Sequence, residues 1–415
     1  MSDPMQHGMA EALRLTQQGR LAEATAIIQR TLGGTFAPAP GGTDVAHEPG
    51  ETARRAVNET ARPEAPPRPD PARKHALRPA PKQPRGFRGM EFPLGDLPGT
   101  MPRPAEVVPA SIVVPAVGRF VERSYTNRAG TRAYKLYIPS GYVGQAVPLV
   151  VMLHGCTQSP DDFAAGTHMN ALAEEHTFLV AYPAQGQNAN MSKCWNWFQA
   201  ADQRRGQGEP SLIAGITCEV VGEYHVDAGR VYLAGMSAGG AMAAILGATY
   251  PDLYAAVGVH SGLAPGAAQD LSSAFTAMQR GGPATVRQDT SVGGESAQTV
   301  PVIVFHGDRD TTVHPRNADH LLAHYQAADG RNGKPASPVT VRQGQVPDGY
   351  AYTCATHHDA EGRAVLEQWT IHGLGHAWSG GSRPGSYTDP KGPDASAEMV
   401  RFFEQHQRPM ERPTD

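Results

Sequence analysis

One serine of this chain stands in a pattern that could make it a nucleophile. Residues 231–240 form a short apolar run that ends in Gly235-x-Ser237-x-Gly239, and a run of small residues follows at once. This order predicts a strand, a tight turn and a helix, with the serine oxygen exposed above a buried sheet. The glycines leave room for a strained turn. The alternative is an ordinary Gly/Ser turn after a buried strand. The two interpretations differ in whether the rest of the chain supplies a base and an acid for the serine.

A serine nucleophile needs a base within hydrogen-bond reach and a carboxylate that orients this base. The base candidate is His376, which lies near glycines after a predicted strand, and its competitors are His372 and His154. The acid candidates are Asp308 and Asp310, in a sharp turn after another apolar run. Asp308 could instead hold its turn through backbone N–H groups. The chain therefore offers serine, acid and histidine in the order typical of α/β sheets with a serine nucleophile.

Acyl transfer also needs N–H donors where the carbonyl oxygen of the substrate becomes negative. We expect one donor at Ala238, directly after the nucleophile, and the other at Cys156, in the loop after an earlier strand. The Cys156 thiol is a rival nucleophile, but no base accompanies it in the local sequence.

Aromatic residues cluster in two of the expected loops. Trp195 and Trp197 lie in a polar insertion, and Trp378 lies beside the base candidate. We expect them to line an apolar acyl cleft together with His154, and the alternative is ordinary packing in the core.

The elements that must position these residues alternate along the chain. Apolar strands that alternate with helices predict an α/β fold with a mostly parallel sheet covered on both faces. Ligands of such sheets bind at the carboxyl ends of the strands. The predicted elements are a hairpin of strands 120–125 and 133–138, strand 148–153, helix 169–176, strands 178–182 and 230–234, helix 238–249, strands 255–260, 302–306 and 366–372, and helix 395–406.

Composition bounds the function and the organisation of the 415 residues. The formal net charge is −4 and 40% of the residues are apolar, which predicts a globular core and argues against a nucleic-acid or anionic membrane partner. We expect a helical hairpin over 1–34, a disordered Pro/Ala/Arg-rich linker over 35–105, a catalytic domain over 106–408 and a tail over 409–415. Residues 1–33 are either a small packing element or a docking segment for a partner or a granule surface.

The cysteines and the N-terminal residues indicate whether the protein binds metal and in which cellular compartment it works. The four cysteines form no Cys-x-x-Cys pair and no zinc-site spacing, so we expect no metal. We also expect no membrane span, since no run reaches about 18 apolar residues. The start of the chain has no signal-peptide pattern, which predicts a cytoplasmic protein. The alternative is secretion.

Five motifs, taken in order, resemble those of the polyhydroxybutyrate depolymerase-like esterases, a family of α/β-hydrolases that also includes feruloyl and acetylxylan esterases. They are LHGCTQSPDDF, CWNWF, GMSAGGAMA, HGDRDTTV and GLGHAWSGG, within residues 106–408. The resemblance implies Ser237 as nucleophile, Asp310 as acid, His376 as base and the loop with Cys156 as the first oxyanion loop. Because some members carry disulfides, it also implies a bridge between Cys156 and Cys194. No cofactor is implied.

The sequence thus predicts a serine carboxylic-ester hydrolase that forms an acyl-enzyme on Ser237. The resemblance implies polyhydroxyalkanoate-type polyester, its 3-hydroxybutyrate oligomers or short acyl esters as substrates. No separate domain for gripping crystalline polymer is evident in the sequence. One alternative is a feruloyl or acetylxylan esterase. A second is a non-catalytic, granule-associated binding protein on a hydrolase scaffold.

Overall fold

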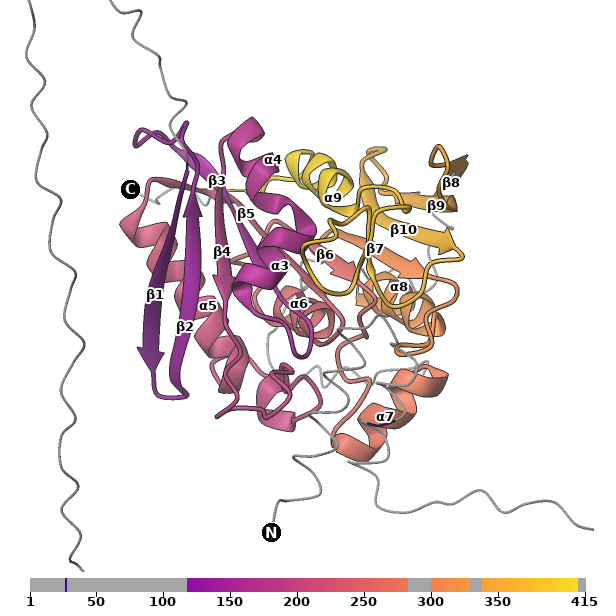
Figure 1. The fold of residues 1–415 in the computed structure, drawn as a ribbon, viewed down its shortest axis with the longest axis horizontal. Helices are drawn as coiled ribbons and strands as arrows, with labels where there is room; N and C mark the ends of the chain where they lie inside the picture. The colour runs from indigo at the N-terminus through magenta and orange to yellow at the C-terminus, as the bar shows by residue number, and fades with distance from the viewer. Residues whose placement is uncertain (1–26, 28–117, 283–299, 329–337, 410–415) are drawn as a thin grey trace, which may run out of the picture. The chain divides into compact units, whose positions relative to one another are not determined.

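The computed structural model describes residue 27 and residues 118–282, 300–328 and 338–409 (Figure 1). The chain divides into a unit over 1–113 and a unit over 114–415, and the second carries the fold that follows. The predicted linker lies outside the described residues. So do all but one residue each of the predicted hairpin and tail, and the docking role of residues 1–33 stays a prediction.

A ten-stranded sheet forms the centre of the second unit, in the order β1-β2-β4-β3-β5-β6-β7-β10-β9-β8. The middle of the sheet, from β4 to β10, is parallel, whereas β1, β2, β8 and β9 join antiparallel at its two ends. The strands are β1 Arg119–Asn127, β2 Gly130–Ile138, β3 Val147–Leu153, β4 Leu179–Pro183, β5 Val226–Met236, β6 Ala256–His260, β7 Val302–Gly307, β8 Val339–Gln345, β9 Ala351–His358 and β10 Ala364–His372.

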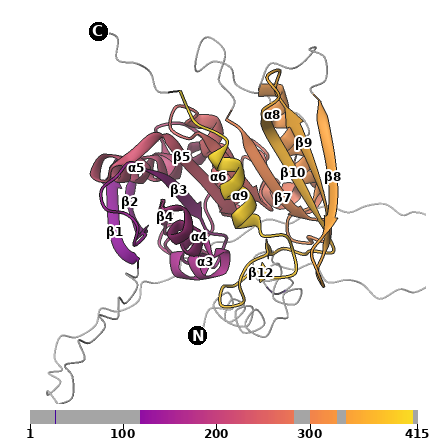
Figure 2. The ribbon, with the colours of Figure 1, turned by 90° about the horizontal axis from the view of Figure 1, so that it is seen from above.

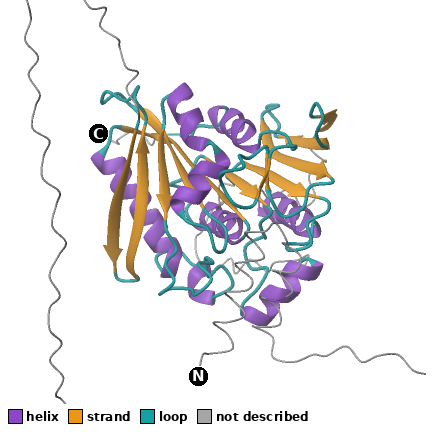
Figure 3. Cartoon of the chain, in the orientation of Figure 1, coloured by secondary structure: helices purple, strands orange, loops and turns teal. Residues whose placement is uncertain are grey.

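Helices lie on both faces of this sheet, as Figure 2 and Figure 3 show. They are α3 Pro160–Thr167, α4 Met169–His176, α5 Gly208–Glu223, α6 Ala238–Thr249, α7 Leu271–Arg280, α8 Arg316–Ala328 and α9 Ala395–Glu404, with a 3₁₀ turn η1 Ala200–Gln203 and a short parallel pair β11 Trp378–Ser379 and β12 Thr388–Asp389. This is the predicted mostly parallel sheet covered on both faces.

Alternation along the strands divides the core into two apolar layers. On β3, Leu149 and Val151 pack into the cluster that contains α5, α6 and α8 residues, while Val150 and Met152 pack into the cluster of α3, α4 and α9. Both clusters are almost fully buried, which is why β3 reads as a continuous apolar run rather than an alternating one.

The hairpin of β8 and β9 has no counterpart among the predicted elements. Nearly every residue of β8 is exposed, and β9 is mostly half-buried, so neither strand carries a continuous apolar run. The pairing of β9 with β10 and of β8 with β9 supplies the hydrogen bonds that a short sequence window does not reveal. Among the described residues, no helix has the length and apolar character required to cross a membrane.

Candidate active site

Ser237 occupies a strained turn between β5 and α6. Its backbone has φ 57° and ψ −120°, a conformation with positive φ that residues other than glycine rarely adopt. Its N–H donates to the His260 carbonyl at 2.9 Å, which ties the turn to the end of β6. A Cβ atom on Gly235 would lie 2.3 Å from the Gly239 oxygen, and one on Gly239 would lie 2.1 Å from the Leu153 oxygen. The pattern Gly-x-Ser-x-Gly is therefore required by close backbone approach.

A buried carboxylate and a histidine meet at the neighbouring strand ends. Asp310 follows β7, and its Oδ2 lies 2.7 Å from Nδ1 of His376, on the loop after β10. The other carboxylate oxygen accepts the N–H groups of Thr312 at 2.9 Å and Val313 at 2.8 Å. The four strands β5, β6, β7 and β10 are consecutive neighbours, so their carboxyl ends bring the serine, the acid and the histidine to one edge of the sheet.

The surroundings keep the Asp310 carboxylate ionised. Burial alone would raise its pKa, but attraction to His376 and hydrogen bonds from His306 and His376 outweigh burial and hold the pKa well below its usual value. The Nε2 atom of His306 lies 3.4 Å from Asp310 Oδ2 and 2.8 Å from the Val313 carbonyl. Because a carbonyl only accepts, this nitrogen carries a proton.

The competing acid and base candidates form a second pair at the rim. Asp308 Oδ2 lies 3.0 Å from His372 Nδ1, and Asp308 Oδ1 accepts the Gly373 N–H at 2.7 Å. The Thr353 hydroxyl lies 2.9 Å from the other ring nitrogen of His372. Asp308 thus holds the start of the loop that carries His376, which combines the predicted turn-holding role with a histidine partner.

His154, the third histidine candidate, is buried beneath the oxyanion loop. Its Nε2 accepts the Gln185 N–H at 3.0 Å, and its Nδ1 donates to the Gly155 carbonyl at 2.7 Å. Burial lowers the pKa of His154 to about 4, so the ring is neutral near pH 7. These contacts give His154 a structural role at the base of the loop.

The loop after β3 lies against the nucleophile. A Cβ atom on Gly155 would lie 3.5 Å from the Ser237 Cβ, so this loop passes close to the serine at the residue before Cys156. Within the described part of the chain, no group accepts the N–H of Cys156 or of Ala238. Both predicted oxyanion donors are therefore free to bind a developing negative charge.

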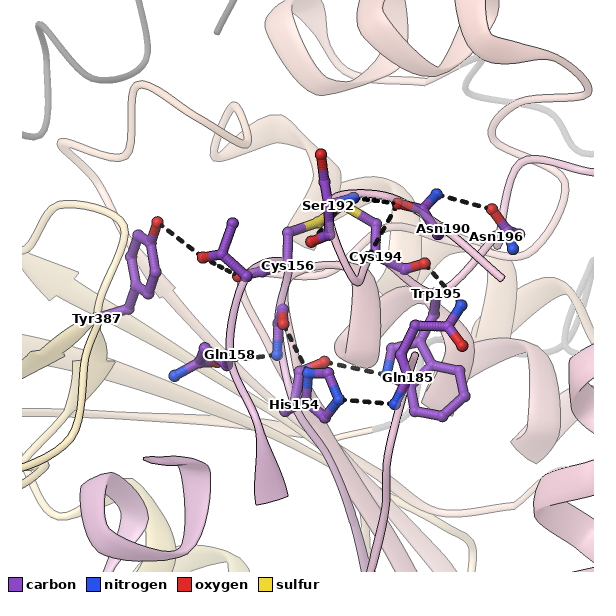
Figure 4. The surroundings of a disulfide bond; sticks show 12 residues. His154, Cys156, Gln158, Gln185, Asn190, Ser192, Cys194, Trp195, Asn196 and Tyr387 are labelled. Carbon is purple, nitrogen blue, oxygen red and sulfur yellow. Dashed lines mark hydrogen bonds between the residues drawn. A yellow bond between two sulfur atoms is a disulfide. The ribbon is translucent and has the colours of Figure 1, made fainter. Parts of the chain in front are cut away.

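A disulfide joins Cys156 to Cys194, with an S–S distance of 2.06 Å and 38 residues of separation (Figure 4). This is the bridge that the family resemblance implies. The next residue, Thr157, donates its N–H to Ser192 at 2.7 Å, and the Gln185 amide donates to the Cys194 carbonyl at 2.8 Å. The bridge and these bonds fasten the oxyanion loop to the insertion after β4.

The predicted aromatic lining is buried in the described structure. Trp195 is 0% exposed and its indole N–H donates to the His154 carbonyl at 3.0 Å, while Trp197 packs in the same core cluster. Trp378 is 1% exposed and donates to Ser396 Oγ at 3.1 Å. Contact between these rings and a substrate would require movement of their loops, so their lining role, like that of His154, stays a prediction.

Two groups near the site were not identified from the sequence. Buried Glu209 accepts the N–H of Asn196 at 2.7 Å and also binds the side chains of Arg132 and Gln185, which anchors the insertion. Burial raises the pKa of Glu209. Glu209 and its partners are single polar residues far apart in the chain, so no motif or spacing in the sequence indicates that they are in contact.

Tyr387 is the second missed group. Its hydroxyl lies 3.3 Å from Thr157 Oγ1, and its ring centroid lies 6.4 Å from that of His376. In Figure 4 it approaches the oxyanion loop from the side opposite to Trp195. Tyr387 therefore borders the space between the oxyanion loop and the base.

Among the described residues, no group of three or more histidine, cysteine or acidic side chains could hold a metal ion.

Comparison with known proteins identifies the family. A family model described as esterase PHB depolymerase matches residues 132–334, which include Ser237 and Asp310. The chain is 34% identical over 256 residues to poly(3-hydroxyalkanoate) depolymerase C of Paucimonas lemoignei, which covers 60% of this chain and 59% of that protein. It is 30% identical over 208 residues to feruloyl esterase B of Neurospora crassa, covering 48% of this chain and 70% of that protein.

A solved structure bears out the fold. The acetyl xylan esterase from Aspergillus awamori superposes with a TM-score of 0.55 at 20% identity, over 69% of this chain and 99% of that one. The chain spans less than two thirds of the length of the Paucimonas depolymerase. These matches show that the chain belongs to the esterase PHB depolymerase family of carboxylic ester hydrolases, with the α/β-hydrolase fold.

Proposed function

We propose that this chain hydrolyses carboxylic esters through an acyl-enzyme on Ser237. The observation that carries the proposal is the strained turn of Ser237 at the same sheet edge as the hydrogen-bonded pair Asp310–His376. Such a turn costs conformational energy, and a strained serine with free N–H donors beside it suits nucleophilic attack.

The chemistry follows from which atoms are free. His376 Nδ1 is held by Asp310, so its Nε2 is the nitrogen that takes the proton as Ser237 Oγ attacks the ester carbonyl. The N–H groups of Cys156 and Ala238 stabilise the tetrahedral oxyanion. His376 then returns the proton to the leaving alcohol, and a water activated in the same way releases the acid and regenerates the serine.

The serine hydroxyl is not hydrogen-bonded to the base in this structure. In the described part of the chain Ser237 Oγ has no hydrogen-bond partner, so the hydroxyl and His376 Nε2 are not yet joined. Catalytic hydrogen bonds are often long without substrate and tighten when it binds. The ionised Asp310 carboxylate favours the imidazolium that forms in the transition state.

Replacing the nucleophile tests the proposal. We expect Ser237→Ala to lower kcat on p-nitrophenyl butyrate by on the order of 10⁴ or more, and to abolish covalent labelling by a fluorophosphonate probe. Ser272→Ala, at an exposed position on α7, is the matched control and should behave as the wild type. Labelling of the wild type would exclude an inert scaffold. Full esterase activity in Ser237→Ala would overturn the proposal.

For the substrate we propose polyhydroxyalkanoate-type esters, either polymer or 3-hydroxybutyrate oligomers. The family description and the 34% identity to a poly(3-hydroxyalkanoate) depolymerase support this choice. A carbohydrate esterase acting on feruloylated or acetylated xylan is the second candidate, supported by the likeness to feruloyl esterase B.

A substrate panel separates the two candidates. The kcat/KM for 3-hydroxybutyrate trimer should exceed those for methyl ferulate and acetylated xylan by at least about tenfold, which corresponds to about 1.4 kcal/mol of transition-state binding. Ser237→Ala is the blank for each substrate. Selective cleavage of the ferulate would assign the chain to the second candidate.

The compartment is also a proposal. The Cys156–Cys194 bridge supports the secreted alternative over a cytoplasmic location, because disulfides persist in oxidising environments. Fractionation of the producing cells, with thiol alkylation before lysis, tests this. Recovery of the protein in the cytoplasm with both thiols reduced would contradict it.

A further inference from the structure

A buried histidine that the proposed reaction does not use is hydrogen-bonded to the turn of the nucleophile and to the segment after the base. His260 is the last residue of β6 and is 0% exposed. Its carbonyl accepts the Ser237 N–H at 2.9 Å, and its ring Nε2 lies 3.0 Å from the N–H of Ser379. Ser379, in β11, follows His376 by three residues, so His260 is hydrogen-bonded both to the turn of Ser237 and to the segment that follows His376.

The direction of these bonds fixes the form of the ring. A backbone N–H only donates, so Nε2 of His260 is unprotonated and accepts, and the ring proton is on Nδ1, which lies 3.2 Å from Ser261 Oγ. Burial and the neighbouring His306 and His376 lower the pKa of His260 to about 3, against the opposing effect of Asp310. The acceptor is therefore present at any pH used for an esterase assay.

The ring is also held by aromatic neighbours from two other elements. It stacks on Phe305 of β7 at a centroid distance of 5.9 Å and on Trp378 at 5.0 Å, with interplanar angles of 10° and 24°. Trp378 is itself fixed by its hydrogen bond to Ser396 of α9. The ring thus has little freedom to rotate, and its hydrogen bond to Ser379 fixes the segment that follows His376.

We infer that His260 is a positioning residue that sets the distance between Ser237 and His376, holding the serine turn with its carbonyl and the histidine loop with its ring nitrogen. The inference rests on the proposed function. A misplacement of about 1 Å between reacting groups can cost about 10² in rate. Loss of the ring acceptor should therefore lower kcat while the apparent affinity for substrate is kept, since His260 is buried and offers no surface to substrate.

Two substitutions separate the ring acceptor from the packing. His260→Phe keeps an aromatic ring against Phe305 and Trp378 but removes the acceptor. His260→Gln loses the ring, but its amide oxygen can take the place of Nε2 as the acceptor for the Ser379 N–H. We expect His260→Phe to lower kcat on p-nitrophenyl butyrate by about 10- to 100-fold with KM within about twofold, and His260→Gln to recover most of that loss.

The readouts separate positioning from general destabilisation. End-point labelling with a fluorophosphonate counts the folded sites, while the rate of labelling reports the reactivity of Ser237. His260→Phe should label to the same end point but at least about tenfold more slowly. A merely structural role would lower the end point or Tm and leave kcat per labelled site unchanged, which would overturn the inference. Equal kcat losses in both variants would also overturn it.

Two further variants keep the test decisive. Should His260→Phe give no folded protein, His260→Asn replaces it, because its amide is too short to reach Ser379 while it stays polar. A wild-type kcat in His260→Asn would then contradict the inference. Ser237→Ala runs in parallel: an inactive Ser237→Ala beside a fully active His260→Phe refutes only the positioning role, whereas an active Ser237→Ala refutes the proposed function.

Discussion

Two aspartate–histidine pairs lie at the same edge of the sheet, and only one has the burial that the proposed mechanism requires. The acids Asp310 and Asp308 are two residues apart in one turn. Their partners are His376, on the loop after β10, and His372, the last residue of β10, with ring nitrogen to carboxylate distances of 2.7 Å and 3.0 Å. The inner pair is buried, with side chains 0% and 11% exposed, whereas the outer pair is 37% and 44% exposed.

The difference shows that hydrogen-bond geometry alone does not identify a catalytic pair. Water screens the charges of the outer pair, so its attraction is weak, as is usual for ion pairs at a protein surface. The inner carboxylate is shielded from water, and its second oxygen is occupied by two backbone N–H groups. It can therefore only orient and stabilise its histidine, which is the role that the proposed mechanism requires.

The largest contrast should appear when the histidines are replaced. We expect His376→Gln to lower kcat on p-nitrophenyl butyrate by on the order of 10⁴ or more, since the serine then has no base. His372→Gln should change kcat by less than about threefold, because its partners Asp308 and Thr353 lie at the rim. Steady-state kinetics on both purified variants measures the contrast. Similar losses would mean that the outer histidine takes part.

Replacing the acids should give the next largest contrast. Asp310→Asn should lower kcat by on the order of 10³–10⁴, because the amide favours the wrong tautomer of His376 and no longer stabilises its charged form. Asp308→Asn should lose less than about tenfold, since its remaining oxygen can still accept the Gly373 N–H and hold the loop. The reverse order in the same kinetic assay would reassign the acid.

Stability should separate the pairs as well. Asp310→Ala leaves buried N–H groups of Thr312 and Val313 without acceptors, so we expect the free energy of unfolding to fall by about 3 kcal/mol. Asp308→Ala should cost less than about 1 kcal/mol, as for exposed pairs. Urea denaturation followed by tryptophan fluorescence gives both values. Equal costs would contradict the difference in burial that underlies the comparison.

The smallest effect is in the pH profile. Because the pKa of Asp310 is held well below its usual value, this carboxylate stays ionised as the pH falls through the range in which an ordinary aspartate gains a proton. The profile of log kcat/KM should therefore show no inflection from Asp310 near the usual aspartate pKa of about 4. Asp308→Asn should leave the profile unchanged, since Asp308 bonds to His372 and Gly373 and not to the inner pair. An inflection of the wild type that Asp310→Asn removes, or a shifted profile in Asp308→Asn, would contradict this.

The strands and the serine turn could be predicted because their signals are local. The apolar run that ends at Met236 becomes β5, and the two glycines around Ser237 are required by backbone contacts within the same motif and with β3. The hairpin of β8 and β9 could not be predicted in this way, because β9 pairs with β10 and β8 pairs with β9, and neither strand has a continuous apolar pattern of its own.

The sequence by itself determined the fold class, the strand-turn-helix setting of Ser237 and the order of the serine, acid and histidine candidates, because apolar periodicity and glycine spacing act over a few residues. The choice between Asp308 and Asp310 was different. Residues alone left it open, the family resemblance favoured Asp310, and the tertiary structure separated the two by burial. The contacts of Glu209, Tyr387 and His260 were decided only by the folding of distant segments onto one another. Burial and hydrogen-bond direction at a sheet edge depend on every strand that meets there, and no single stretch of sequence contains them.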